Sequence, residues 1–266
     1  MNNHLTKLET RAILEISGLD RKKFLQGLIT NDVNKTSQEH LIFSAMLNSQ
    51  GRFLYDFFIF EDGEKLVVDC PALRRDEILQ KLNFYKLRAL VEIRKNDEIL
   101  VTQSFENIGF ADPRCKALGN RFYLKKSEEK NFTFQDSSKY HFTRISNKIA
   151  DGELDLSYEK SFILEFGFDD LNAIDYQKGC YVGQELTART HYRGEIRKKL
   201  FHIKINDITA QNLKDCEITC EGKTAGIILS STIHEKALHA LALIKISEEE
   251  FAEKLEFQGN KIFIIN

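Results

Sequence analysis

The chain has 266 residues, of which 42% are hydrophobic and 29% are charged, and its formal net charge is -2. A chain of this length can bury a substantial core and form one large domain or two modest ones. The near-neutral charge gives no general argument for nucleic-acid binding. No apolar run reaches the roughly 20 residues that a membrane-spanning helix needs, so no membrane partner is expected.

The cysteines and the N-terminal residues indicate the compartment. Five scattered cysteines, in a chain too large to need disulfides, favour reduced thiols in a reducing environment. The first residues lack the apolar segment of a signal peptide and the Arg-rich, acid-free character of a transit peptide. By elimination we predict a cytoplasmic protein, and the abundance of Lys, Ile, Asn and Phe favours a bacterial source.

The first third of the chain predicts a strand, a helix and an antiparallel meander. Residues 11–16 alternate apolar and charged side chains as a strand does, and Asp20 is a candidate N-cap for a helix over residues 21–30. Turn signals then separate three apolar runs, which is typical of a meander. These runs are residues 40–48, 53–60 and 65–69.

The middle of the chain continues with mixed elements. Residues 72–85 predict a helix whose buried side carries Leu73, Ile78, Leu79 and Leu82. Strands are expected over 90–94, 99–103 and 121–125, a surface loop over 127–131 and a helix over 140–150. Because helices and strands do not alternate strictly, the order favours an α+β domain with antiparallel sheets over a doubly wound fold.

After Gly194 the pattern becomes mostly β. Short runs separated by turns at 206–207 and 221–222 predict a small barrel. The runs are 199–205, 217–220, 225–230 and 240–246, followed by a hairpin over 257–265. We therefore place the domain boundary near Arg197, with a first domain of residues 1–196 and a β-barrel domain of residues 197–266.

One stretch, from Tyr176 to Gly194, combines reactive, charged and backbone-permissive residues. Its centre, residues 178–185, reads Lys-Gly-Cys-Tyr-Val-Gly-Gln-Glu. Glycines at this spacing allow a sharp turn, and a thiol beside cations can become nucleophilic or metal-binding. The residues alone also allow a buried cysteine beside a turn with solvated charges.

This stretch resembles the signature of the YgfZ family, folate-binding relatives of the glycine-cleavage T-protein that support iron–sulfur cluster assembly. The match is unbroken from Lys178 to Glu185, and weaker similarity occurs near residues 11–33, 46–59, 85–93 and 109–121. The resemblance implies a T-protein-like folate-binding region followed by a C-terminal β-barrel. It also implies that Cys180 is the reactive or iron-ligating residue, within a motif of Lys178, Gly179, Tyr181, Gly183, Gln184, Glu185, Arg189 and Arg193.

Asp56 lies inside a strongly apolar strand, residues 53–60. An unpaired buried carboxylate is costly, so the residues alone favour a solvent-facing or capped Asp56. The resemblance instead matches Asp56 to the second of two acids that T-proteins carry near the folate. Tyr55 replaces the first acid, which argues against aminomethyl transfer and leaves open whether the protein is an enzyme.

Three further residues are candidates for folate binding. Glu165 lies in an apolar run, and its carboxylate can accept paired N–H groups such as those of a pterin, which is the role that the resemblance gives it. Arg88 and Arg114 have planar guanidinium groups suited to a folate's glutamate tail. The alternatives are an N-cap or a rim salt bridge for Glu165, and surface charge pairs for the arginines.

No intrinsic metal site is expected, because Cys216 and Cys220 lack zinc-type spacing and no other ligand run occurs. Cys180 can still hold a transient iron–sulfur cluster together with a partner's thiols. The basic residues after Cys180 could face tRNA or an acidic partner, although the net charge does not support tRNA.

These observations lead to one leading hypothesis and two alternatives. The leading hypothesis is a tetrahydrofolate-binding accessory factor for iron–sulfur cluster assembly or repair that uses Cys180 and works with A-type iron–sulfur carrier proteins. The first alternative is a folate-dependent transferase, either aminomethyltransferase-like or tRNA-modifying. The second is a non-catalytic folate-binding scaffold.

Overall fold

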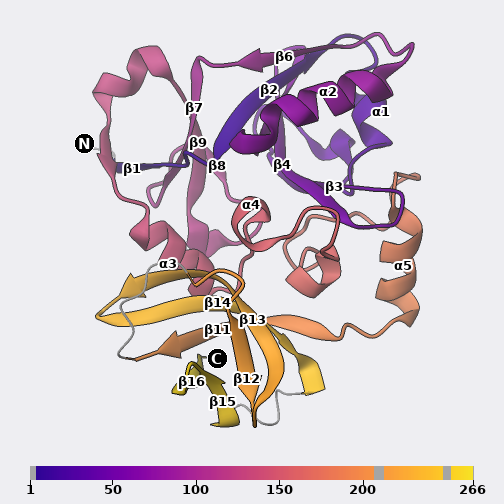
Figure 1. Cartoon of the computed structure of the whole chain (residues 1–266). Coiled ribbons are helices and arrows are strands. Elements are labelled where there is room, and N and C mark those ends of the chain that lie inside the picture. Colours follow the sequence, from indigo (N-terminus) through magenta and orange to yellow (C-terminus); the bar gives the residue numbers. More distant parts are fainter. Residues whose placement is uncertain (1–3, 207–212, 248–252, 266) are drawn as a thin grey trace.

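Two five-stranded sheets and a closed barrel make up the protein in the computed structural model, which describes residues 4–206, 213–247 and 253–265. Figure 1 shows the two sheets side by side, with the barrel below them. The predicted α+β class, with antiparallel sheets followed by a small C-terminal barrel, is confirmed. No helix among the described residues is long and apolar enough to cross a membrane.

The first sheet contains the predicted meander. Its strand order is β3-β4-β5-β2-β6, with every neighbouring pair antiparallel. The strands are β2 (Arg11–Ser17), β3 (Ile42–Leu47), β4 (Phe53–Asp62), β5 (Lys65–Pro71) and β6 (Glu92–Asn96). Both faces of β3 and of most of β4 are buried, which explains their nearly continuous apolar sequences.

Helices cover one face of this sheet, and the rest of the protein covers the other. Helices α1 (Arg21–Gln26) and α2 (Arg75–Lys86) pack on the face that carries Tyr55, Phe57 and Ile59. Phe58 and Phe60 point to the opposite face, into the core that the two sheets share. Alternation along β4 therefore places Asp56, like Phe58, on the side between the sheets.

The second sheet has the order β10-β1-β7-β9-β8. Its strands are β1 (His4–Lys7), β7 (Ile99–Ser104), β8 (Phe110–Ala111), β9 (Asn120–Lys125) and β10 (Thr133–Gln135). Strand β10 runs parallel to β1, and the other pairs are antiparallel. Two short helices, α3 (Ser138–Ser146) and α4 (Gly152–Asp155), follow this sheet and connect it to the centre of the molecule (Figure 1).

Six antiparallel strands form the barrel in the order β11-β14-β13-β12-β15-β16, and β16 closes it against β11. They are β11 (Lys198–Ile205), β12 (Glu217–Cys220), β13 (Lys223–His234), β14 (Ala237–Lys245), β15 (Leu255–Phe257) and β16 (Asn260–Ile265). Closure leaves no sheet edge exposed. Helix α5 (Gln184–Arg193) precedes the barrel, and five short 3₁₀ helices complete the described elements: η1 (Val33–Lys35), η2 (Ala72–Arg74), η3 (Lys116–Leu118), η4 (Lys126–Asn131) and η5 (Ile163–Phe166).

Several local predictions need correction. The helix predicted over 21–30 ends at Gln26, and the Asp20 carboxylate accepts the Leu90 N–H instead of capping that helix. Leu73 is exposed because residues 72–74 form η2 and not the first turn of α2. Residues 126–131 form η4 and not a loop, and the helix predicted over 140–150 ends at Ser146. Of the turn predicted at 206–207, residue 207 lies outside the described residues.

Candidate functional site

Lys178 anchors the Cys180 loop to the end of α1. Its ammonium group donates hydrogen bonds to the backbone carbonyls of Gln26 at 2.7 Å, Ile29 at 2.6 Å and Asn31 at 2.8 Å. Burial lowers the pKa of Lys178 to about 8. All three N–H donors are therefore used inside the protein, so Lys178 positions the loop and does not donate to the Cys180 thiol as the sequence suggested.

A second contact fixes the other end of the loop. Gly183 has a φ of +85° and begins α5, and a Cβ atom there would lie 2.5 Å from the Asn48 carbonyl and 2.8 Å from the Leu47 Cβ. The Cα atom of Gly51, in the β3–β4 turn, would lie 3.2 Å from the same Cβ atom. Only glycine fits this approach without displacing backbone. The side-chain Oε1 atom of Gln184 also accepts the Tyr181 N–H at 3.1 Å, which tightens the turn.

Cys180 is exposed between these anchors. Tyr181 beside it is buried, and its ring lies 5.1 Å from the Lys178 ammonium. The structure describes all five cysteines: Cys180 is exposed, Cys115 and Cys216 are half-buried, and Cys70 and Cys220 are buried. The alternative of a buried Cys180 is therefore wrong.

Helix α5 carries the rest of the motif away from the thiol. Glu185 lies in its first turn, and Arg189 and Arg193 follow one turn apart; all three side chains are exposed. Gly179, unlike Gly183, has open space where a Cβ would lie. The motif therefore divides into anchors that are buried (Lys178, Tyr181) or half-buried (Gly183) and exposed groups (Cys180, Glu185, Arg189, Arg193).

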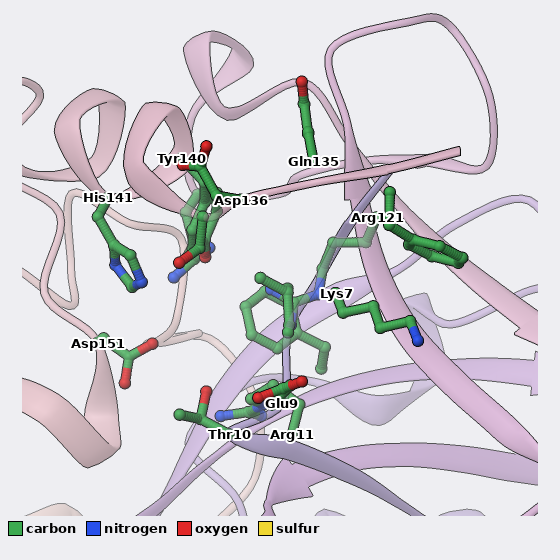
Figure 2. Close-up of a pocket in the computed structure, with 15 residues that line it drawn as sticks. Lys7, Glu9, Thr10, Arg11, Arg121, Gln135, Asp136, Tyr140, His141 and Asp151 are labelled. Atoms are coloured by element: carbon green, nitrogen blue, oxygen red, sulfur yellow. The ribbon is translucent and has the colours of Figure 1, made fainter. Parts of the chain in front are cut away.

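A separate cavity of about 490 Å³ lies between the two sheets and α3. Figure 2 shows Arg11 with Glu9 and Thr10 on one side of it, Arg121 on another, and Tyr140 and His141 from α3 opposite. Phe58 and Phe134 supply aromatic surface, and Asp151 and Arg114 complete the polar lining. Its size and mixed lining suit a small organic ligand.

Three buried arginines surround the ring of Phe58. The guanidinium carbons of Arg121, Arg114 and Arg11 lie 3.6 Å, 4.8 Å and 5.3 Å from the ring centroid. Because cations favour the electron-rich face of an aromatic ring, Phe58 offsets part of the cost of burying them. Aspartates offset the remainder.

Each arginine pairs with a buried aspartate. Arg11 donates to Asp69 at 2.6 Å and to Asp56 at 2.9 Å. Arg114 donates two bonds to Asp112, at 3.0 Å and 2.8 Å. Although burial alone would raise it, the pKa of Asp112 is lowered, chiefly by Arg114.

Arg121 retains an unused donor. Its buried Nη2 atom forms an ion-pair contact with Asp69 Oδ2 at 2.9 Å, but this contact does not have hydrogen-bond geometry. Within the described residues Nη2 therefore makes no hydrogen bond. Arg121 lines the cavity, and such a donor is satisfied by a ligand acceptor or by water. Nearby His141 has its pKa lowered to about 4 by burial, so it lines the cavity as a neutral imidazole near pH 7.

Asp56 and Asp151 form a close pair of carboxylates. Asp56 is 1% exposed, so the solvent-facing alternative is wrong. Burial and the neighbouring Asp151 raise the pKa of Asp56. The pKa of Asp151 is lowered, because the nearby Arg144 and Arg11 outweigh the effect of burial. Asp151 also caps α4 through the N–H groups of Glu153 and Leu154. The two carboxylates therefore titrate as an interacting pair, with the pKa of Asp56 raised and that of Asp151 lowered.

The structure does not bring all the predicted folate ligands together. Arg114 lines the cavity and Asp56 contacts its Arg11, but Glu165 lines a separate cavity of about 350 Å³ beside α5. Burial raises the pKa of Glu165 there. Arg88 is an exposed residue of the connection between α2 and β6, on the helix-covered side of the first sheet, so it is a surface charge.

Tyr55, at the position of the first T-protein acid, points away from Asp56. Its hydroxyl donates to Glu77 at 2.6 Å on the α2 side of β4. The two positions therefore do not form a pair in this fold, whichever residue occupies position 55.

Sequence reasoning missed most of the cavity's charged groups. Arg11 begins β2, and Arg121 is the second residue of β9; Asp69, which pairs with both, lies inside the apolar run of β5 as Asp56 does in β4. A charged residue within an apolar strand was the available signal, and it applied to Asp69 as well as to Asp56.

Comparisons with known proteins show which proteins the chain is similar to. No protein-family model matches the chain. The chain is 32% identical over 227 residues to the mitochondrial iron–sulfur cluster assembly factor IBA57 homolog of Pyricularia oryzae, covering 76% of this chain and 57% of that protein. It is also 32% identical over 224 residues to the IBA57 homolog of Mycosarcoma maydis, covering 74% of this chain and 56% of that one.

The chain is therefore similar to IBA57 homologues, which are YgfZ-like and T-protein-related. It spans a little over half the length of these curated relatives. The fold agrees: the crystal structure of the glycine cleavage system aminomethyltransferase T from Bartonella henselae matches with a TM-score of 0.75 at 10% identity, covering 100% of this chain and 85% of that one. At this identity the match shows the fold alone.

The same relatives correct one prediction. They are mitochondrial proteins of eukaryotes, so the predicted bacterial cytoplasmic location is contradicted. That prediction used N-terminal composition and residue usage, which carry no information on where relatives of the folded domain work.

Proposed function

We propose that this YgfZ-like chain is an iron–sulfur cluster assembly factor that ligates cluster iron through Cys180 and binds a reduced folate in the cavity between the sheets. The observation that carries the proposal is the exposed Cys180, held between the buried anchor Lys178 and the close backbone approach at Gly183. The printed names of the relatives, iron–sulfur cluster assembly factors, support the process.

A single exposed thiol suits a shared cluster. A thiol loses its proton when it binds iron, and cluster irons are completed by several thiolates. No group of three or more metal-ligating side chains occurs among the residues that the structure describes. The remaining thiolates would therefore come from a partner, for which A-type carrier proteins are our proposal.

The cavity between the sheets supports the folate part of the proposal. Its lining residues Phe134 and Tyr140 offer aromatic surface to a flat pterin, and the buried Arg121 Nη2 atom makes no hydrogen bond within the described residues. A pterin carbonyl or a folate carboxylate supplies an acceptor for this atom. When bound, the reduced folate would supply a reduced pterin that carries one-carbon groups. The chain's own residues would position this ring and keep it from water.

A genetic experiment tests the thiol. The chain is directed to the compartment in which a host's own family member works, in a strain that lacks that member, and iron–sulfur enzyme activities are measured. Wild type and Cys216→Ser should restore them, whereas Cys180→Ser should not, although all three proteins melt alike. Full restoration by Cys180→Ser would exclude the thiol as a ligand and leave the scaffold hypothesis.

Calorimetry with tetrahydrofolate tests the cavity. Arg114→Lys changes a lining guanidinium, and Arg88→Lys makes the same change on the surface. We expect saturable binding by wild type and by Arg88→Lys. Arg114→Lys should weaken binding at least about tenfold, because lysine cannot keep the bidentate pairing with Asp112 that holds residue 114 in the cavity wall. Absence of saturable binding by wild type would reject the folate site.

A further inference from the structure

Two loops and the last turn of α2, at one end of the first sheet, hold four large apolar side chains in solvent. Leu19 and Leu87 are each 86% exposed, Phe84 is 76% exposed and Leu90 is 63% exposed. Leu19 precedes α1, Phe84 lies in the last turn of α2, and Leu87 and Leu90 lie between α2 and β6. In Figure 1 these elements lie at the end of the molecule opposite the barrel. We call these four residues the apolar tip.

Specific contacts join the two loops. The Leu90 N–H donates to the Asp20 carboxylate at 2.8 Å, and the Asp20 N–H donates to the Leu90 carbonyl at 3.3 Å. Gly18 has a φ of +106°, and a Cβ there would lie 2.1 Å from the Leu90 carbonyl oxygen. The approach of the loops therefore requires glycine at position 18, and it fixes Leu19 beside Leu90.

Leu87 is held in an unfavourable backbone conformation. Its φ of +45° and ψ of -107° are rare for any residue with a Cβ. Such strain persists only where surrounding structure imposes it, and it often marks a functional segment. Here it ends α2 with a leucine that points into water, at a cost that burial in the fold does not offset.

Cations alternate with the apolar tip. Lys86 and Arg88 flank Leu87, and Lys23 lies in the short helix α1 that follows Leu19. Of the acids beside the tip, Asp20 already accepts the Leu90 N–H, and Glu92 is paired with Arg94. This end of the protein is therefore locally positive, although the whole chain carries a net charge of -2.

We propose that the apolar tip docks this protein on an anionic lipid bilayer. Leucines that are 86% exposed touch little of their own protein, so they form separate projections and not the walls of a groove. A bilayer interface accepts projections of any spacing, while its phosphates attract the flanking cations. A second copy of the chain would instead bring the same cations together, which is unfavourable.

Surface docking is compatible with the sequence. The expectation of no membrane partner rested on the lack of a spanning apolar run, whereas a peripheral protein needs only a few apolar side chains beside cations. The inference is independent of the function proposed for Cys180, because it uses none of the motif or cavity residues.

Vesicle co-sedimentation tests the inference with the whole chain. Vesicles of phosphatidylcholine alone are compared with vesicles that also contain phosphatidylglycerol. We expect wild type to bind the anionic vesicles, and high salt to weaken that binding. The double variant Leu19→Ser/Leu87→Asn should reduce the bound-to-free ratio at least about tenfold, because it removes two leucines that become buried when the protein docks on the bilayer.

Matched variants make the result specific. Leu73→Ser removes a leucine that is 88% exposed but lies in η2, before the first turn of α2 and away from the apolar tip, and it should bind like wild type. Lys86→Glu/Arg88→Glu should lose binding to anionic vesicles. These substitutions are at exposed or half-buried positions, and thermal melts verify the fold.

Three results would overturn the inference: no binding to anionic vesicles, equal binding to neutral ones, or wild-type binding by the double variant. Sedimentation velocity adds a fourth. A wild-type dimer that the double variant abolishes would assign the apolar tip to self-association and not to a bilayer.

Discussion

The Lys178 ammonium donates a 2.6 Å hydrogen bond to the backbone carbonyl of Ile29, across 149 positions of the sequence. With its bonds to Gln26 and Asn31, it satisfies carbonyls just beyond α1, where no further helical turn exists to bind them. The most recognisable motif of the chain therefore begins with a structural lysine.

Replacing Lys178 with Met should lower the free energy of unfolding by about 3 kcal/mol, because three buried carbonyls lose a charged donor. Urea denaturation measures the change. Lys35→Met is the control: Lys35 pairs with Asp175 but is half exposed, so its loss should cost under about 1 kcal/mol. Equal effects of the two changes would show that the carbonyl contacts do not stabilise the fold.

The two glycines that flank Cys180 should respond differently to alanine. Gly183→Ala places a Cβ against Asn48 and Leu47 in a left-handed conformation, and it should destabilise the protein by about 2–4 kcal/mol. Gly179→Ala places its Cβ in open space and should change stability by less than about 1 kcal/mol. Thermal melts of the two variants compare them directly; similar melting temperatures would contradict the close approach at Gly183.

Gly152 keeps space for the Asp56 carboxylate. A Cβ at position 152 would lie 2.4 Å from Asp56 Oδ1, so Gly152→Ala should cost about 1–3 kcal/mol through displacement of that carboxylate from Arg11. A double-mutant cycle measures the contact. In an Asp56→Ser background the same alanine should cost less, and strict additivity would argue against the contact.

Acid should weaken the junction between α3 and the barrel. Burial, with His239 and Lys148 nearby, lowers the pKa of His202 from 6.5 to about 4. The folded state therefore keeps His202 neutral, and its contribution, complete above the unfolded pKa, is lost as pH falls from 6.5 toward 4.

Chemical denaturation at two pH values checks this dependence. When the pH is lowered from about 7 to about 5, the free energy of unfolding of wild type should fall by about 1 kcal/mol more than that of His202→Gln, after allowance for solvent screening. His40→Gln, at an exposed histidine in the first sheet's loops, should follow wild type. Identical pH profiles for wild type and His202→Gln would refute the assignment.

The sequence by itself determined most of the elements and the resemblance to YgfZ-like proteins. Alternation and turn residues predicted the meander of β3, β4 and β5 and the later β strands, because these are contacts between neighbours in the chain. An eight-residue motif was specific enough to indicate the YgfZ-like relationship, and it located the exposed Cys180.

Only the tertiary structure decided which charged groups meet. Arg11 pairs with Asp56 and Asp69 across 45 and 58 positions, and Lys178 reaches carbonyls about 150 positions away; local patterns contain no information on such distances. It also separated Glu165 from Asp56 and left Arg88 on the surface. The physical reason is that the cost of burying a charge depends on its partners, which the packing of distant strands selects.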